Sequence, residues 1–317
     1  MTPEINLHRP EQQTEGFSTK LTSHFDIEFL FQNALILIDH GDYELSLNLL
    51  DTILAEDEYH AEALNWRGYC LLQLGRVEKA IETYFKLAES SPSETNYFYL
   101  ADAFYTAAQD ELAKEFFLKA LEMINYESPH LFQIYKKLGN ISTRARDFDA
   151  AEEYYDKAYT ITPHSDDLFV NYGTLEMQKE NFDAALERFK HAISLNKNND
   201  KAWIGLSLIY RSRGDVELSW GELLHALDIN PKNAVGVKLA VDWGIMEMEY
   251  ERAIAILEKF LNVAEPNADW IFTYAGLLYQ AGDWKESKKI LELLLAEKPK
   301  YQAAAELLKK IDHKVNV

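Results

Sequence analysis

The stretch that decides the fold is FQIYKKLGNISTRARDFDAAEEYYDKAYTITPHS, residues 132–165. Small residues (Gly139, Ala151, Ala158) alternate with large apolar ones at helical spacing, and Pro163 follows the second apolar run. Small residues let two helices approach to about 8–10 Å, while large ones fill the space between them. Proline stops a helix because it lacks the backbone N–H. The stretch therefore predicts two packed helices joined by a short turn.

The same pattern recurs along the chain. It resembles the tetratricopeptide repeat (TPR), a helix–turn–helix unit of about 34 residues. In residues 132–165 the resemblance rests on Leu138-Gly139, Ala151, Tyr155, Ala158 and Pro163. Copies of the pattern start at Ile27, Ala61, Glu94, Phe132, Asp166, Asp200, Ala234 and Ala268.

This resemblance implies an all-α fold, a right-handed α-solenoid of about eight TPR helix–turn–helix repeats plus a C-terminal capping helix. One repeat alone leaves an apolar face open, so only a stack of repeats is stable. We expect a flexible tail over residues 1–26, acidic repeats 1–3 over 27–126 and an insertion or bend over 127–131. Repeats 4–8 follow over 132–299, and the capping helix and tail occupy 300–317.

The chain is acidic, with a formal net charge of −20. Residues 27–131 carry 19 acidic and 6 basic side chains, so most of the excess lies in the first repeats. Such a surface repels phosphate backbones, and no nucleic-acid partner is expected. It favours a basic partner, although solubility alone also explains it.

The sequence has no apolar run of about 18 residues, so no membrane insertion is expected. The polar N-terminus, without a basic start or an apolar run, does not resemble a secretory signal. The single cysteine, Cys70, excludes an internal disulfide and is typical of a reducing compartment, which predicts a cytoplasmic location.

The motifs of enzymes are missing from the sequence. No glycine-rich phosphate-binding loop occurs, the nine histidines are scattered, and one cysteine gives no basis for a zinc site. The carboxylates around Glu152 and Glu153 are interpreted as the solvated face of a helix. We therefore expect no cofactor, no metal and no enzymatic activity.

The resemblance implies that partners bind a concave groove lined by the first helix of each repeat. In repeats 1–3 this groove is expected to be apolar and aromatic with acidic spots, suited to an amphipathic helix or an apolar peptide with basic residues. The alternative is that tight winding or a dimer buries these side chains. The predicted residues are Phe31, Leu35, Ile38, Asn65, Tyr69, Leu72, Phe98, Asp102 and Tyr105.

Repeats 4–6 present polar and basic groove residues instead. Some TPR co-chaperones hold a C-terminal carboxylate with a two-carboxylate clamp. This chain matches that pattern at Lys136, Asn140, Asn171 and Lys201, but Gly205 stands where the pattern has arginine. Arg144 or Arg211 is the expected substitute, because charged donors bind carboxylates strongly. The predicted residues are Lys136, Asn140, Arg144, Asn171, Lys201 and Arg211.

The first helix is apolar on nearly every side, which is unusual for the end of a solenoid. We expect the tail, a partner or a second copy of the chain, forming a homodimer, to cover it. The main hypothesis is a protein–protein interaction scaffold or adaptor that binds a peptide, helix or small domain. The alternatives are a regulatory subunit holding a folded switch protein such as a small GTPase, a component of a larger assembly, and a co-chaperone-like carboxylate clamp.

Overall fold

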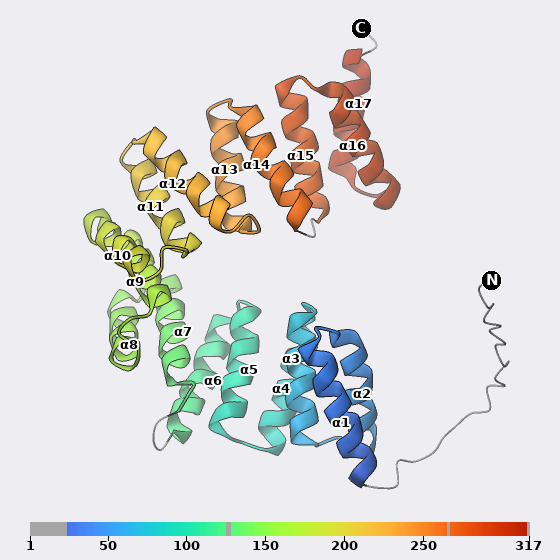
Figure 1. Cartoon of the computed structure of the whole chain (residues 1–317), viewed down its shortest axis with the longest axis vertical. Helices are drawn as coiled ribbons and strands as arrows, with labels where there is room; N and C mark the ends of the chain where they lie inside the picture. The colour runs from blue at the N-terminus through green and yellow to red at the C-terminus, as the bar shows by residue number, and fades with distance from the viewer. Residues whose placement is uncertain (1–23, 125–127, 265–266, 316–317) are drawn as a thin grey trace, which may run out of the picture. The chain divides into compact units, whose positions relative to one another are not determined.

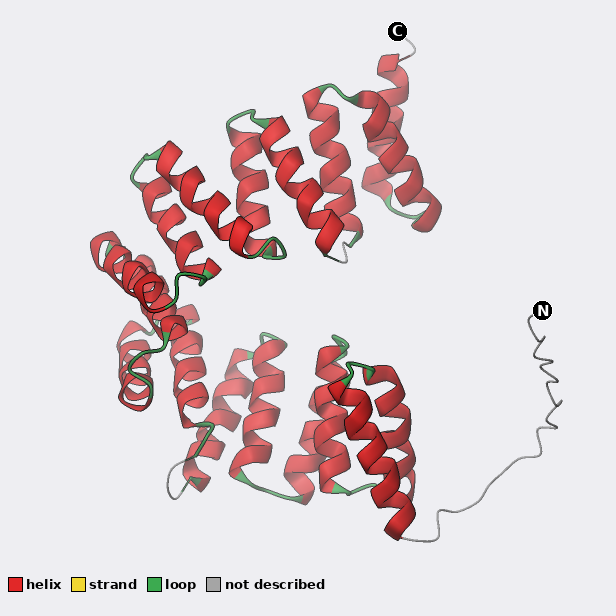
Figure 2. Cartoon of the chain, in the orientation of Figure 1, coloured by secondary structure: helices red, strands yellow, loops and turns green. Residues whose placement is uncertain are grey.

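A computed structural model describes residues 24–124, 128–264 and 267–315. These residues form seventeen α-helices and no strand (Figures 1 and 2). The helices are α1 (His24–Asp39), α2 (Tyr43–Glu56), α3 (Ala61–Gln73), α4 (Val77–Ser90), α5 (Glu94–Thr106), α6 (Asp110–Met123), α7 (Leu131–Arg144), α8 (Phe148–Ile161), α9 (Asp166–Gln178), α10 (Phe182–Leu195), α11 (Asp200–Ser212), α12 (Val216–Ile229), α13 (Ala234–Met246), α14 (Tyr250–Val263), α15 (Ala268–Ala281), α16 (Trp284–Glu297) and α17 (Gln302–Val315).

The helices form eight pairs, followed by α17. Within each pair a short turn contains one residue in the left-handed conformation, with φ between 55° and 90°. Glycine adopts this conformation without steric cost, and four of the turns use it. The eight turn residues are Gly41, Gly75, Ala108, Arg146, Glu180, Gly214, Met248 and Gly282. Their regular spacing confirms the predicted array of helix–turn–helix repeats.

Small residues on the first helix of a pair make room for a ring from the second helix. A Cβ atom added to Gly68 would lie 2.4 Å from the Tyr84 ring, and one added to Gly139 would lie 2.3 Å from the Tyr155 ring. Both rings are almost fully buried. Side chains at these two glycines would overlap the rings, so the predicted role of the small residues is confirmed.

The last helix packs against α15 and α16. Ala304 and Ile311 of α17 are buried in one apolar cluster with Leu291 and Leu294 of α16. This helix covers the apolar face that the eighth pair would otherwise leave open, as a capping helix must.

Helix ends can be compared with the predicted repeat bounds. The first helix begins at His24 rather than Ile27, and α6 ends at Met123 rather than near residue 126. The capping helix runs from Gln302 to Val315, within the range 300–317 given to the capping helix and tail. The rest of the predicted tail, residues 1–23, and residues 125–127 lie outside the described part of the chain.

The chain divides into two compact units, Met1–Ile134 (unit 1) and Tyr135–Val317 (unit 2). The division falls inside α7, a few residues after the predicted insertion at 127–131. A bend at that insertion remains a prediction. Consecutive helices pack against one another within each unit, for example α3 with α4 in unit 1 and α9 with α10 in unit 2.

Candidate functional site

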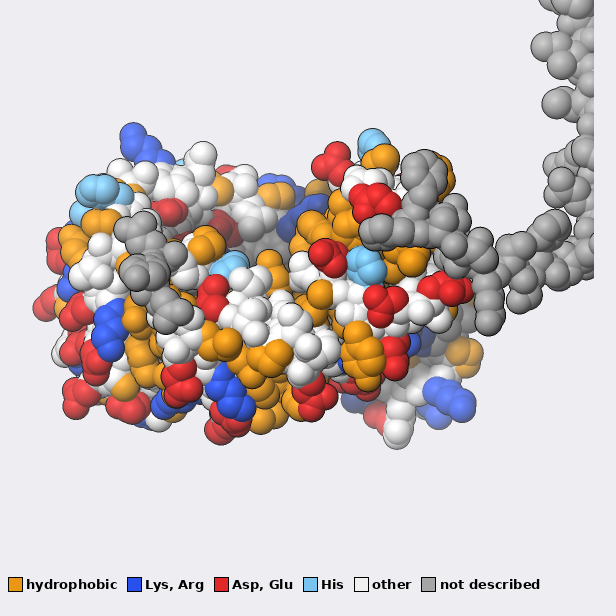
Figure 3. Space-filling model, turned by 90° about the horizontal axis from the view of Figure 1, so that it is seen from below, with side chains coloured by type: hydrophobic (Ala, Val, Ile, Leu, Met, Phe, Trp, Pro, Cys, Tyr) orange, Lys and Arg blue, Asp and Glu red, His pale blue; other side chains and the backbone are white. Residues whose placement is uncertain are grey.

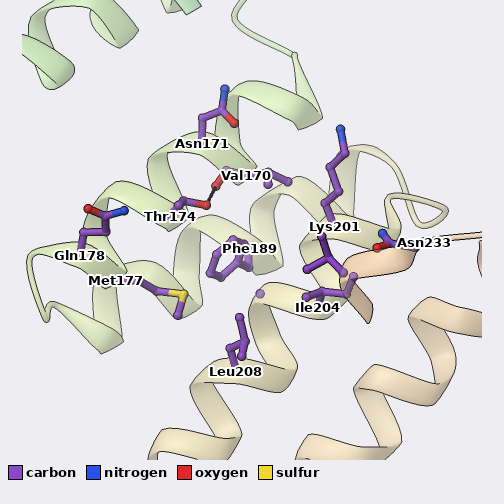
Figure 4. A pocket seen from close by; sticks show the side chains of 12 residues that line it. Val170, Asn171, Thr174, Met177, Gln178, Phe189, Lys201, Ile204, Leu208 and Asn233 are labelled. Atoms are coloured by element: carbon purple, nitrogen blue, oxygen red, sulfur yellow. Dashed lines mark hydrogen bonds between the residues drawn. The ribbon is translucent and has the colours of Figure 1, made fainter. Parts of the chain in front are cut away.

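Unit 2 contains a cavity of about 660 Å³ between α9 and α11 (Figure 4). Its walls are mainly apolar, and the beginning of α13 closes one side. The lining residues are Val170, Asn171, Thr174, Met177, Gln178, Phe189, Lys201, Ile204, Gly205, Leu208, Asn233 and Val235. Most of them lie on the first helices of repeats 5 and 6, the helices that the resemblance assigned to a groove.

Phe189 of α10 forms the base of this cavity. A Cβ atom added to Gly173 would lie 2.7 Å from the Phe189 ring, and one added to Gly205 would lie 2.4 Å from it. The ring is therefore held between α9 and α11, in a space that exists only because both positions are glycine. Figure 4 shows Met177, Ile204 and Leu208 arranged around it.

Two side-chain amides at the cavity are available to a ligand. Within the described part of the chain, neither Asn171 nor Gln178 makes a side-chain hydrogen bond. Each amide can donate and accept, as a peptide group can. The third amide, Asn233, is engaged: it donates to Asp200 over 2.7 Å and accepts from the Gly236 N–H over 3.0 Å.

Two of the predicted lysines face one carboxylate at the start of α9. The Nζ of Lys136 lies 4.0 Å from Asp167 Oδ2, and the Nζ of Lys201 lies 3.7 Å from Asp167 Oδ1. Burial lowers the pKa of Lys136, and Lys201 lowers it further while Asp167 opposes the shift. Lys201 is the more accessible of the two, with 65% of its side chain exposed.

The other predicted residues of repeats 4–6 do not line the cavity. Asn140 accepts a hydrogen bond of 2.8 Å from the hydroxyl of Tyr155. Arg144 is exposed at the end of α7. Of the six predicted residues, Asn171 and Lys201 line the cavity.

Arg211 belongs to a polar cluster beside α13. It forms an ion pair with Glu247, and its guanidinium group lies 4.7 Å from the centre of the Trp243 ring. Trp220 Nε1 donates a 2.8 Å hydrogen bond to the same carboxylate. Burial acts to raise the pKa of Glu247, but the bonds from Trp220 and Arg211 outweigh it and leave the pKa lowered.

The prediction for repeats 1–3 is wrong for Phe98. Only 7% of this side chain is exposed, and its ring stacks on the His130 ring at a centroid distance of 4.2 Å. Phe98 therefore belongs to the core. Helical periodicity could not show this, because His130 reaches it from beyond the end of the repeat.

The other predicted groove residues of unit 1 are half-buried. Aromatic side chains lie next to several of them. The Tyr69 ring makes edge contacts with the Tyr43 and Trp66 rings, and the centroid of the Phe31 ring lies 6.0 Å from that of the His60 ring. The remaining half-buried residues of this set are Leu35, Ile38, Asn65, Leu72, Asp102 and Tyr105.

The apolar first helix exposes part of its surface. Phe29 is 63% and Ile36 is 55% exposed. On the face that Figure 3 displays, hydrophobic side chains lie between acidic ones.

Two further features of the described residues bear on other functions. No helix there is long and apolar enough to cross a membrane. The described histidine, cysteine, aspartate and glutamate side chains include no group of three or more placed to hold a metal ion.

Sequence reasoning did not identify several residues of the cavity as a site. It treated Gly205 as a missing arginine, and it gave no role to Met177, Gln178 or Phe189. A signal was present, because position 6 of the repeat is glycine only at residue 205. Periodicity alone does not show that the Phe189 ring occupies the space this glycine leaves.

Comparison with known families supports the repeat assignment. Tetratricopeptide repeat models match residues 31–95 and 173–234, residues 132–165, and residues 245–311. The chain belongs to the tetratricopeptide repeat family, whose members mediate protein–protein interaction.

Two relatives share short stretches with this chain. It is 27% identical to DnaJ homolog subfamily C member 3 of Gallus gallus over 137 residues, which are 43% of this chain and 26% of the relative. It is 25% identical to Tetratricopeptide repeat protein 21B of Xenopus laevis over 138 residues, 43% of this chain and 10% of the relative. The chain thus matches only a minor part of either relative.

Solved structures share the fold. A tetratricopeptide repeat protein from Parabacteroides merdae has a TM-score of 0.53 and 16% identity, covering 90% of this chain and 99% of its own. The APC/C hetero-tetramer Cut9–Hcn1 has a TM-score of 0.53 and 17% identity, covering 92% of this chain and 57% of that chain. At these identities the likeness shows the α-solenoid fold.

Proposed function

We propose that this protein is a non-enzymatic interaction scaffold whose unit 2 cavity binds a peptide segment of a partner protein. The observation that carries the proposal is the open apolar cavity between α9 and α11, with two unengaged amides at its edge. Ligand sites typically combine apolar walls with a few polar groups that fix orientation.

The chemistry of the cavity suits a peptide. An apolar side chain of the partner would pack on Met177, Leu208 and Val235, the apolar lining residues that keep exposed surface, and would leave water there. The amides of Asn171 and Gln178 would pair with backbone groups of the same segment. Unpaired polar groups are costly to bury, so these two bonds favour a peptide over a purely apolar ligand.

The test fills the cavity without disturbing the core. Thr174 is exposed on α9 and its hydroxyl bonds the Val170 carbonyl oxygen, so Thr174→Trp places a large ring at the cavity. Thr160 on α8 is also exposed and makes a similar bond to the Lys157 carbonyl oxygen, so Thr160→Trp is the matched control. Peptides selected from a random display library on the full chain should lose at least about tenfold in affinity for Thr174→Trp, about 1.4 kcal/mol.

The control variant should bind like the wild type. Equal affinity of both tryptophan variants, or a library that yields no binding peptide, would overturn the proposal. Circular dichroism of both variants checks that each keeps its helices.

The exposed part of α1 supports a second candidate function. Phe29 and Ile36 present apolar surface at the end of unit 1, where a folded partner domain or a second copy of the chain would bury it. The double variant Phe29→Glu/Ile36→Glu should then abolish capture of that partner, or halve a dimeric mass in light scattering, while leaving peptide binding unchanged. A monomeric wild type with the same captured proteins as the variant would exclude this candidate.

A cytoplasmic location stays a prediction. The buried thiol of Cys70 forms no disulfide and donates to Ser46 Oγ over 3.8 Å, which supports the interpretation of Cys70 as a packing residue.

A further inference from the structure

The carboxylate of Asp167 lies between two lysines at one end of the cavity. Its two oxygens are 4.0 Å from Lys136 Nζ and 3.7 Å from Lys201 Nζ. Lys201 also lines the cavity, so an acidic ligand that reached this lysine would meet the Asp167 carboxylate at the same place.

A second carboxylate lies beside Asp167. Beside Asp167, the carboxylate of Asp166 accepts amide hydrogen bonds of 2.6 Å from Asn196 and 2.9 Å from Asn199. Burial acts to raise the pKa of Asp166, but these bonds outweigh it and leave the pKa lowered. Lys136 therefore lies near two carboxylates, those of Asp166 and Asp167, and Lys201 forms its ion pair with Asp167.

The rest of the cavity has no cation that could replace the lysines. Apart from Lys201, the lining residues are uncharged. At position 205 a glycine packs on the Phe189 ring, and a longer basic side chain would overlap that ring. The acidic net charge of −20 over the whole chain opposes an acidic ligand further.

From this arrangement we propose that Asp167 is a specificity-determining residue, which makes the cavity select a peptide segment with an uncharged apolar side chain and reject acidic ones. The inference rests on the proposed peptide-binding function. Asp167 acts by forming ion pairs with Lys136 and Lys201 of the same chain. A partner segment then gains its affinity from apolar contact with Met177, Leu208 and Val235 rather than from a carboxylate.

The variant Asp167→Asn separates these two sources of affinity. It keeps the size of the side chain but removes one negative charge 3.7 Å from Lys201 and 4.0 Å from Lys136. The control is Asp183→Asn, which removes the same charge from a fully exposed site beside Arg213, away from the cavity lining.

The experiment selects peptides from one random heptapeptide display library on three full-length proteins: the wild type, Asp167→Asn and Asp183→Asn. The wild type and Asp183→Asn should enrich peptides with an apolar residue and with fewer acidic residues than the starting library. Asp167→Asn should enrich acidic residues next to the apolar one. Fluorescence anisotropy should then show about tenfold tighter binding of an acidic peptide to Asp167→Asn than to the wild type, and less than a twofold change for its neutral counterpart.

Two results would overturn the inference while the proposed function stands. In the first, the wild type itself enriches acidic peptides that depend on Lys136 and Lys201, as a carboxylate clamp would. In the second, the wild type and Asp167→Asn select the same peptides, and Thr174→Trp still abolishes their binding. If Thr174→Trp leaves peptide binding intact, the proposed function fails as well.

Discussion

Two equivalent rings show how similar repeats give different surfaces. Tyr84 in unit 1 packs on Gly68, and Phe189 in unit 2 packs on Gly173. In unit 1 the next repeat supplies Tyr99, whose ring stacks on Tyr84 at a centroid distance of 5.7 Å. In unit 2 the equivalent residue is Gly205, and the Phe189 ring lines a cavity instead. One side chain per repeat thus decides whether the first-helix surface is filled or open.

The loops between repeats differ as well. In unit 2 the carboxylates of Asp166 and Asp200 each accept hydrogen bonds from two asparagines about thirty residues later. Repeats 1 and 2 start with Ile27 and Ala61, which cannot form such bonds. Repeats 5 and 6 therefore have carboxylate–amide hydrogen bonds that repeats 1 and 2 lack at these positions.

The largest expected effect tests whether the two rings are equivalent. Phe189→Ala and Tyr84→Ala each remove an almost fully buried ring and should each lower the free energy of unfolding by about 3–5 kcal/mol. Phe182→Ala, at a partly exposed position on α10, should cost much less. Urea denaturation measures all three. A much smaller loss of unfolding free energy for Tyr84→Ala than for Phe189→Ala would show that the two rings are not equivalent.

The next effect concerns the glycine that distinguishes unit 2. Gly205→Ala would place a Cβ atom 2.4 Å from the Phe189 ring and should lower the free energy of unfolding by about 1–3 kcal/mol, although alanine favours a helix. Gly221→Ala on α12 meets no atom within 4 Å and should instead raise stability by up to about 1 kcal/mol. Thermal unfolding of both variants checks whether each substitution raises or lowers the stability. If Gly205→Ala stabilised the protein, the Phe189 ring would have to move freely to make room for the added methyl group.

The smallest effect is a dependence on pH. The lowered pKa of Asp166 means that its ionised form stabilises the folded state above the unfolded pKa of about 3.9, and that this contribution is lost as the pH falls through the folded value. Asp166→Asn should therefore cost about 1 kcal/mol at pH 7 and progressively less below about pH 4.

Asp183→Asn is the control for this pH dependence, because that carboxylate is fully exposed. This variant should change the urea midpoint little at pH 7 and at pH 3. A constant loss of stability for Asp166→Asn from pH 7 to pH 3 would show that the charge of Asp166 does not matter.

The repeat could be predicted from the sequence alone. The spacing of Gly139, Ala151, Tyr155 and Pro163, repeated along the chain, specified paired helices because packing at this distance requires small residues at fixed helical positions. The family resemblance also assigned a groove to the first helix of each pair, and two residues predicted there, Asn171 and Lys201, line the cavity. These features are local or periodic, so they can be read along one chain.

Only the tertiary structure decided which part of that surface is open. Phe98 is buried because His130 stacks on it, and Arg211 is held by Glu247 and Trp243, contacts that lie outside the repeat pattern. The pairing of Asp167 with lysines from α7 and α11 likewise joins residues of three repeats. Such contacts depend on side-chain size and charge across neighbouring repeats, which a period within the sequence does not encode.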